Sequence, residues 1–460
     1  MTSSLATSAS IARLQAGISG RLIGPDDADY DQVRTVVSGE IDLRPAAIVR
    51  VADADDVGRV IGFARETGLE LAVRSGGHSG AGHGSTEGGI VIDLRDMRGL
   101  EIDPDAGTAW AETGLTAGEL TTAAAAHELA VGFGDTGSVG IGGITLGGGV
   151  GYLVRRHGLT IDSLLAAEVV TADGRLLHTD ARTEPDLFWA IRGGGGNFGV
   201  ATRFRFRLHR LPGIVGGILV LPATAEVVAG FIAAAEAAPE ELSTIANVMN
   251  CPPLPFVAEE HHGRLVVLGM LAYAGEADPG ARAIAPFRAL ATPLADMVRP
   301  MPYPEMFPPE DESYRPTAVA ETMFIDAVDR DVAGLIVDRL EASDASMRVA
   351  QLRVLGGAMA RVPADATAFA HRASRIMVNL AAFYQGPDDR AGRREWVRDF
   401  AAALRQSDGG AYVNFLGDEG QARVRDAYPA PTWQRLAAIK ARYDPANLFH
   451  RNHTIPPASS

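Results

Sequence analysis

Apolar and polar positions alternate along the first 210 residues in a way that predicts strands and helices in turn. The run AAIVRVA at 46–52 predicts a strand, and apolar residues recurring every three to four positions predict a helix from Asp55 to Thr67. Gly68 would end this helix. The apolar run at 69–75 predicts the next strand, which leads directly into a glycine-rich loop. This alternation is typical of α/β units.

The pattern changes from about Leu211 onwards. Long apolar runs at 263–273, 348–355 and 374–384 predict strands that are separated by helices and proline-rich loops. Strands of this kind are typical of an antiparallel sheet that carries helices on one side. The sequence therefore predicts a second domain with a different architecture.

The C-terminal segment returns to the first pattern. A strand is predicted at 411–417, followed by a helix that Asp444 and Pro445 end. We therefore expect a first domain, a second domain and a segment that returns to the first domain, with the boundaries 1–210, 211–410 and 411–460.

Composition and charge argue against several classes of protein. The net charge is −15 and no block of basic residues occurs, so neither nucleic acid nor an anionic membrane is expected as a partner. No apolar run reaches the roughly 18 residues that span a bilayer, and the N-terminus lacks the features of a secretory signal. A single cysteine, Cys251, excludes an internal disulfide and fits a reducing cytoplasm. The 11 histidines show no metal-ligand spacing, so no metal site is expected.

Glycine is the residue type that stands out, with 52 of 460 residues and dense runs at 76–89, 132–151 and 193–199. The loop RSGGHSGAGHG (74–84) loses much conformational entropy on ordering, which indicates a need for bare backbone amides. Two matches to the dinucleotide fingerprint GxGxxG lack its strand–loop–helix context, because no helix is predicted after the first and a strand follows the second. We expect instead a phosphate cradle of backbone N–H groups, with a tight surface turn as the alternative. His83, on the flank of the loop, is expected to have no role.

Four segments carry a resemblance to a known family. They are RSGGHS (74–79), VGIGGITLGGGVGYLVRRHGLTIDSLLAAEVVTADG (139–174), FWAIRGGGGNFGV (188–200), and YVNFLGDEG (412–420) with YDPANLFHRNHTIPP (443–457). In this order they resemble the flavoproteins of the vanillyl-alcohol oxidase / p-cresol methylhydroxylase superfamily, in the berberine-bridge-enzyme-like branch. The resemblance covers nearly the whole chain.

The resemblance implies a fold, a cofactor and a set of binding residues. It implies an α+β fold, in which an FAD-binding domain of the p-cresol methylhydroxylase type, with two α/β subdomains, is joined to a substrate domain whose antiparallel sheet is flanked by helices. It also implies FAD that is attached once, through its 8α-methyl group, to His78. The residues expected at the cofactor are Arg74, Ser75, Gly76, Gly77, His78, Ser79, Thr136, Gly137, Ser138, Val139, Gly142, Gly143, Thr145, Gly147, Gly149, Val200, Tyr412, Asn414 and Asn452.

The chain departs from the family pattern at two positions. Many members attach the flavin a second time through a cysteine, but Thr136 stands at that position and Cys251 lies far away in the sequence. The resemblance therefore implies a monocovalent flavin. The tail of many members has two asparagines two residues apart; here Asn452 is kept and Thr454 replaces the second.

Oxidation of a substrate also needs a group that takes an O–H or N–H proton as hydride leaves. Tyr412 and Asn414 share one face of the predicted strand, which the resemblance places over the flavin. Gln351 and Arg353 share a face of the central second-domain strand, where the family often has a carboxylate and this chain has none. Tyr152 follows the second flavin-lining segment. These five residues are the catalytic candidates, with a packed tyrosine and an ion-paired arginine as the alternatives.

The resemblance implies an FAD-dependent oxidoreductase, and three functions stay open. The first is an oxidase, in which O2 takes the electrons and forms H2O2. The second is a dehydrogenase that uses another electron acceptor, and the third is a flavin-binding protein without turnover. The apolar strand faces of the second domain favour a small, fairly apolar alcohol or amine over a sugar. We expect a monomer or homodimer, located in the cytoplasm, whose partners are this small molecule and O2.

Overall fold

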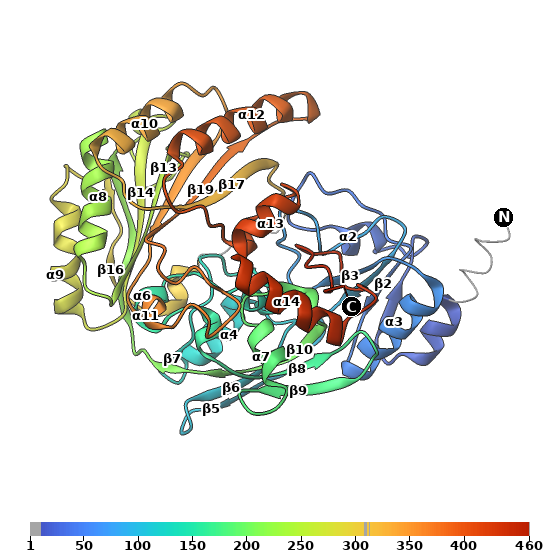
Figure 1. The fold of residues 1–460 in the computed structure, drawn as a ribbon. Helices are drawn as coiled ribbons and strands as arrows, with labels where there is room; N and C mark the ends of the chain where they lie inside the picture. Colours follow the sequence, from blue (N-terminus) through green and yellow to red (C-terminus); the bar gives the residue numbers. More distant parts are fainter. Residues whose placement is uncertain (1–10, 308–310, 312, 460) are drawn as a thin grey trace.

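The computed structural model describes residues 11–307, 311 and 313–459, and this part of the chain forms two domains (Figure 1). One domain contains a four-stranded and a five-stranded sheet, and we call it the two-sheet domain. The other contains an eight-stranded sheet, and we call it the large-sheet domain. None of the described helices is long and apolar enough to cross a membrane.

The four-stranded sheet positions the first glycine-rich loop. Its order is β1 (Arg21–Ile23), β2 (Ala47–Arg50), β4 (Ile90–Asp93) and β3 (Leu71–Arg74), and the last three strands are parallel. Helix α3 (Ala54–Thr67) begins at Asp53, whose carboxylate accepts the N–H of Asp56, and ends at Gly68 with φ +71°. The loop follows the carboxyl end of β3, where ligands commonly bind in parallel sheets.

The five-stranded sheet is the second sheet of the two-sheet domain, and all its strands are antiparallel. Its order is β5 (Leu100–Asp103), β6 (Thr108–Glu112), β10 (Val200–Arg207), β8 (Leu164–Val170) and β9 (Leu176–Asp180). Helix α4 (Ala117–Ala125) begins with the Thr116/Glu119 capping box. The C-terminal helices α13 (Gln421–Ala427) and α14 (Ala430–Tyr443) share an apolar core with this sheet and with α7 (Pro185–Ala190). The end of the chain therefore returns to the two-sheet domain.

The large sheet carries its helices on one face (Figure 1). Its strands, in order, are β15 (Ala295–Asp296), β12 (Ile214–Pro222), β14 (Leu265–Tyr273), β13 (Leu242–Asn250), β18 (Arg348–Val354), β19 (Ile376–Phe383) and β17 (Ala318–Ile325), with β16 (Arg299–Met301) beside β12. The covering helices are α8 (Ala225–Ala237), α9 (Ala277–Arg288), α10 (Arg330–Glu341) and α12 (Pro387–Leu404). The opposite face packs on the two-sheet domain through apolar side chains such as Val150, Phe324, Met377 and Tyr412.

Short elements complete the fold. They are α2 (Tyr30–Arg34), β7 (Leu129–Ala130), α5 (Ile141–Leu146), α6 (Val154–His157), η1 (Thr160–Asp162), η2 (Gly195–Asn197), β11 (His209–Arg210), η3 (Glu259–His261), η4 (Tyr303–Met306), α11 (Ala358–Arg361) and η5 (Val413–Phe415).

Two predicted features are wrong. No strand forms at 411–417; Tyr412 is extended, and a 3₁₀ turn at Val413–Phe415 follows, in which the N–H of Phe415 donates to the carbonyl of Tyr412. The glycine-rich segment also contains a helix, α5, where none was predicted. Gly142 fits in this helix because it packs against the side chain of Ser75, so tertiary contact overrides the low helix propensity of glycine.

Candidate functional site

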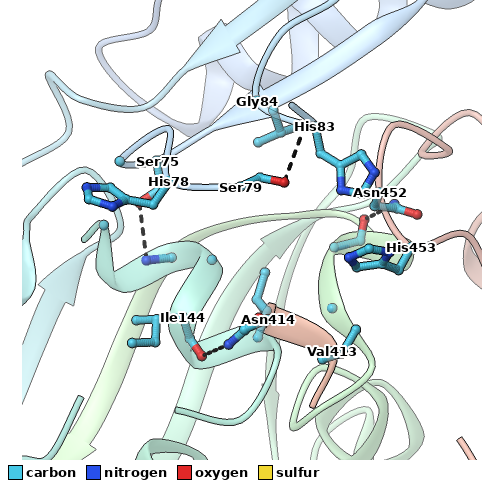
Figure 2. A pocket seen from close by; sticks show the side chains of 18 of the residues that line it. Ser75, His78, Ser79, His83, Gly84, Ile144, Val413, Asn414, Asn452 and His453 are labelled. Carbon is cyan, nitrogen blue, oxygen red and sulfur yellow. Dashed lines mark hydrogen bonds between the residues drawn. The ribbon is translucent and has the colours of Figure 1, made fainter. Parts of the chain in front are cut away.

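A cavity of about 370 Å³ lies within the two-sheet domain, between the loop after β3, the glycine-rich segment around α5 and the C-terminal tail. Figure 2 shows part of its lining, with His78 at one end of the view and His83 and His453 side by side at the other. Its size is typical of a ligand site. The predicted residues that line it are Arg74, Ser75, Gly76, Gly77, His78, Ser79, Thr136, Val139, Gly142, Gly143, Val200, Tyr412, Asn414 and Asn452.

The loop after β3 is pressed against the N-terminal end of α5. A Cβ on Gly76 would clash with the backbone nitrogen of Gly140. Ser75 ties the two segments together, because its hydroxyl donates to the carbonyl of Thr113 at 2.6 Å and accepts the N–H of Gly142 at 3.2 Å. Gly77 has φ +76°, a conformation that favours glycine. Glycine is thus required here for the path of the backbone.

His78 projects from this loop into the cavity lining. Its Nε2 lies 3.0 Å from the hydroxyl of Ser138, in the turn before α5. The hydroxyl can donate to a neutral ring nitrogen or accept from a protonated one, so the contact orients the imidazole in either tautomer. Ser138 itself is not a lining residue, and its role is to hold His78.

A buried network of ion pairs holds the start of the loop after β3 in place. The guanidinium of Arg74 contacts Asp93 at 2.8 Å, and both side chains are almost fully buried. Arg95 reaches the same carboxylate at 2.7 Å. Burial alone would raise the pKa of Asp93, but the charges of Arg74 and Arg95 outweigh burial and lower it. The carboxylate therefore stays ionised, and Arg74 is anchored at the end of β3.

Glycines on two segments leave open space along the cavity wall. A Cβ on Gly143, in α5, or on Gly196, in η2, would meet no atom within 4 Å. Both residues line the cavity. A planar ring system can lie against such bare backbone, and the N–H groups of the loop around Gly76 and Gly77 suit a diphosphate. The residues present therefore fit FAD.

The C-terminal tail closes one side of the cavity. Lys440 and Asp444 form a fully buried ion pair of 2.6 Å, and Asp444 accepts the N–H groups of Leu448 and Phe449. This network fixes the turn that brings Asn452 to the cavity, where its amide donates to the carbonyl of Gly196 at 3.2 Å. The tail is thus held by polar contacts in a dry environment, which makes its position specific.

Two histidines border the cavity at the tail. The rings of His83 and His453 meet edge to face with centroids 4.7 Å apart. Burial lowers the pKa of His83 to about 3 and that of His453 to about 4. Both rings are therefore neutral at pH 7. From the sequence, His83 was expected to have no role; the structure places it in the lining of the cavity.

The ring of Tyr412 lines the cavity, but its hydroxyl points into the backbone behind it. The oxygen lies within hydrogen-bond distance of the N–H groups of Gly149 (3.0 Å) and Val150 (3.2 Å) and of the Asn414 amide nitrogen (2.9 Å). Asn414 also donates to the carbonyl of Ile144 at 3.0 Å, as Figure 2 shows. Tyr412 and Asn414 are thus brought together by a turn, although the predicted strand does not form.

A carboxylate that the sequence did not reveal also lines the cavity. Asp135, in the turn before α5, contacts Arg353 of β18 at 2.6 Å. Arg353 is buried, and it also donates to the side chain of Gln351 and lies 5.1 Å from the ring centre of Phe415. The predicted pair Gln351 and Arg353 therefore does not line the cavity, but it holds a residue that does.

The remaining predicted residues do not line the cavity. Tyr152 is buried against Phe307, and its hydroxyl contacts the backbone carbonyl of Asp135 at 3.5 Å. Gly147 and Gly149 admit the side chains of Asn414 and Thr160, since a Cβ on either glycine would clash with them. The residues outside the lining are Gly137, Ser138, Thr145, Gly147, Gly149, Tyr152, Gln351 and Arg353. Among the described residues, no group of three or more metal-ligating side chains gathers that could hold a metal ion.

Comparison with known proteins agrees with this geometry. A family model for an FAD binding domain matches residues 45–180, and one described as berberine and berberine like matches residues 411–456. The chain is 31% identical to (R)-6-hydroxynicotine oxidase of Paenarthrobacter nicotinovorans over the whole of both chains. It is 30% identical to xylooligosaccharide oxidase of Thermothelomyces thermophilus over 90% of this chain and 88% of that one. It superimposes on the crystal structure of 6-hydroxy-D-nicotine oxidase from Arthrobacter nicotinovorans with TM-score 0.85 at 29% identity, covering 96% and 98% of the two chains.

The fold and these matches define an FAD-linked oxidoreductase, in which an FAD-binding domain is joined to a domain with an antiparallel sheet. The chain belongs to the vanillyl-alcohol oxidase / p-cresol methylhydroxylase superfamily, in its berberine-bridge-enzyme-like branch. The family and the fold class predicted from the sequence are confirmed.

Proposed function

We propose that this enzyme is an oxidase that removes a hydride from a small, fairly apolar alcohol or amine and passes the electrons to O2, forming H2O2. The observation that supports it most is the cavity itself, in which a glycine-lined wall and His78 adjoin the carboxylate of Asp135. FAD, when bound, accepts a hydride from a C–H bond and gives the electrons to O2. The chain supplies placement and a proton acceptor.

We propose further that FAD is attached to His78 alone. The support is the position of His78 in the lining and its contact with Ser138. Thr136 lines the cavity and carries no thiol. Cys251 is buried among Val220, Val257 and Val266 of the large-sheet domain, so it cannot serve as a second attachment point.

The other predicted cofactor residues keep their proposed roles in two groups. The loop residues from Arg74 to Ser79 would hold the diphosphate through backbone N–H groups, with Arg74 fixing the start of the loop through Asp93. The residues around α5, with Val200, Tyr412, Asn414 and Asn452, would enclose the ring system. A fixed ring with water excluded is what hydride transfer requires.

The substrate side of the cavity supports a small and fairly apolar molecule. Phe415, Val150 and Leu146 line it, and Asp135 is the acidic residue among the described lining side chains. An alcohol or amine offers both an apolar body and a single polar hydrogen for this carboxylate. We also propose a cytoplasmic monomer or homodimer, which a chain with one buried cysteine suits.

Anaerobic mixing tests this function. The purified holoenzyme is mixed with 4-hydroxybenzylamine, 4-hydroxybenzyl alcohol and xylobiose, and flavin absorbance is followed before and after air is admitted. We expect the amine or the aromatic alcohol to bleach the flavin, xylobiose to leave it oxidised, and air to restore colour with one H2O2 per substrate. Bleaching that persists in air while an artificial acceptor restores colour would show a dehydrogenase. Unbleached flavin with every compound would contradict the proposal.

A further inference from the structure

The cavity wall contains a carboxylate whose two oxygens have different surroundings. Oδ2 of Asp135 is bound by Arg353 at 2.6 Å. Among the described residues, no side chain or backbone group donates a hydrogen bond to Oδ1. The Asp135 side chain is 22% exposed, whereas that of Arg353 is 4% exposed, so the carboxylate borders the cavity and the guanidinium does not. One oxygen is held and the other is open to a ligand.

We propose that Asp135 is the catalytic residue that receives the substrate's O–H or N–H proton, and that Arg353 is the residue that positions it. This inference rests on the proposed function. It assigns the proton to a residue that was not among the candidates from the sequence, which were Tyr412, Asn414, Gln351, Arg353 and Tyr152.

A chain of hydrogen bonds fixes the orientation of the carboxylate. Arg353 donates to the amide oxygen of Gln351 at 2.7 Å and to the carbonyl of Val150 at 3.3 Å. Gln351 in turn donates to the side chain of Asn247 on β13 at 2.9 Å. The guanidinium is therefore fixed from two neighbouring strands, which leaves Asp135 little freedom to turn away from the cavity. A positioned base needs such fixed geometry.

Tyr412 is poorly arranged for the same task. Three N–H donors surround its phenol oxygen, from Gly149, Val150 and Asn414, and they occupy the lone pairs that a proton would need. Burial raises the pKa of the hydroxyl and outweighs the hydrogen bonds that lower it, so the group stays a neutral phenol. Its contacts indicate that it anchors the turn at Gly149.

The charges around Asp135 narrow the class of substrate. A lone carboxylate would favour a protonated ammonium group, which cannot release a hydride from its carbon until it loses the proton. Arg353 offsets this charge, so the pair favours a neutral hydrogen-bond donor. Tyr152 and Tyr303 also lie near Asp135, and burial raises the pKa of each phenol well above neutral, so they add no charge. The site thus suits an alcohol or a free-base amine.

Oxidation of the substrate moves one proton and one hydride. The O–H or N–H bond of the substrate breaks and its proton moves to Oδ1 of Asp135. The bonding pair becomes the second bond of C=O or C=N, while the adjacent C–H bond gives its hydride to the flavin. The substrate loses two electrons and two hydrogens, and the flavin and Asp135 receive them. In the proposed oxidase reaction, O2 then takes the two electrons from the flavin and forms H2O2.

The test compares Asp135→Asn with Asp162→Asn. Asp162 forms a comparable pair with Arg372, at 2.7 and 2.8 Å, and its side chain is 9% exposed against 22% for Asp135, but neither Asp162 nor Arg372 lines the cavity. Both variants weaken a contact between the two domains, so Asp162→Asn, whose pair is more buried, should lower Tm at least as much as Asp135→Asn does. Anaerobic flavin reduction by the compound that bleaches the wild type fastest should slow about 100-fold or more in Asp135→Asn and stay near the wild-type rate in Asp162→Asn.

Conservative variants and a binding measurement separate proton transfer from structure. Asp135→Glu, which keeps a carboxylate, should recover part of the reduction rate that Asp135→Asn loses. Arg353→Lys, which keeps the cation, should slow reduction less than Arg353→Gln does. The methyl ether of the alcohol, or the N,N-dimethyl analogue of the amine, has no O–H or N–H proton to give and should bind the wild type more weakly than the substrate does.

Several results would overturn the inference. They are equal reduction rates in the two Asp→Asn variants, equal rates in Arg353→Lys and Arg353→Gln, or a larger loss of rate in Tyr412→Phe than in Asp135→Asn. Any of these with a wild type that is bleached would leave the proposed function standing. A wild type that no compound bleaches would remove the proposed function and this inference together.

Discussion

The two sides of the cavity are built from different parts of the chain. The side proposed for the cofactor is formed by glycine backbone: Gly76 packs against Gly140, and Gly143 and Gly196 face open space. The side proposed for the substrate is formed by side chains, which are hydrogen-bonded in a chain from Asn247 through Gln351 and Arg353 to Asp135. The glycine positions would tolerate no larger residue with a cofactor bound, whereas the side chains of the hydrogen-bonded chain can be replaced one at a time. The first suits a constant cofactor and the second suits a substrate that differs between relatives.

The largest expected effect breaks the side proposed for the cofactor alone. Gly143→Val should lower flavin occupancy about tenfold or more, because the valine side chain would fill the space proposed for the flavin ring. A Cβ at Gly143 meets no protein atom within 4 Å, so the substitution should not disturb the protein itself. The matched control is Gly392→Val. Gly392 also lies inside a helix with no atom within 4 Å of a Cβ, but it faces solvent on α12. Absorbance of the purified proteins measures occupancy, and equal occupancy in both variants would show that α5 does not contact the flavin.

A smaller effect concerns acid and the two histidines at the tail. Burial lowers the pKa of His83 to about 3 and of His453 to about 4, whereas the unfolded state binds a proton near pH 6.5. The unfolded state therefore binds more protons, and stability falls as pH drops from about 6.5 towards 4. Each ring should contribute a loss of about 1–2 kcal/mol at pH 5. Urea unfolding at pH 7.5 and 5 measures the loss.

Variants test the source of this acid sensitivity. His83→Gln and His453→Gln should each flatten the dependence of unfolding free energy on pH, whereas His127→Gln, at an exposed position, should leave it unchanged. A dependence that is the same in all three variants would assign the acid sensitivity to other groups.

The smallest expected effect is that of Tyr412→Phe. Loss of the hydroxyl leaves the buried N–H groups of Gly149 and Val150 without their acceptor, which should lower the free energy of unfolding by about 1–3 kcal/mol. Flavin reduction should slow less than in Asp135→Asn. Urea unfolding and stopped-flow absorbance check the two parts, and unchanged stability would show that the hydroxyl does not anchor this turn.

Local signals predicted much of the fold. The helix predicted from Asp55 to Thr67 agrees with the observed helix within one residue, because its N-cap Asp53 and its C-cap Gly68 are neighbours of the helix in the sequence. The loop at Gly76 and Gly77 was recognised because glycine density is itself a local property. In both cases the residues that decide the structure are neighbours in the sequence.

The features that the sequence did not predict depend on contacts between residues far apart in the chain. The strand expected at 411–417 is absent, because the Tyr412 hydroxyl is held by backbone N–H groups some 260 positions earlier. Asp135 was missed because its partner Arg353 lies 218 positions away. Arg353, on a strand that also carries Arg348 and Gln351, was the available signal, since a guanidinium buried in a sheet needs a carboxylate.

Peptide mapping tests whether the cavity holds FAD through a bond to His78. Wild-type protein is precipitated with acid, digested, and its flavin-bearing peptide is identified by mass spectrometry beside the same digest of His78→Ala. We expect the flavin to stay with the wild-type protein on the peptide that contains His78, and acid to release all flavin from His78→Ala. Flavin that acid frees from the wild type, or that remains attached in His78→Ala, would contradict this expectation.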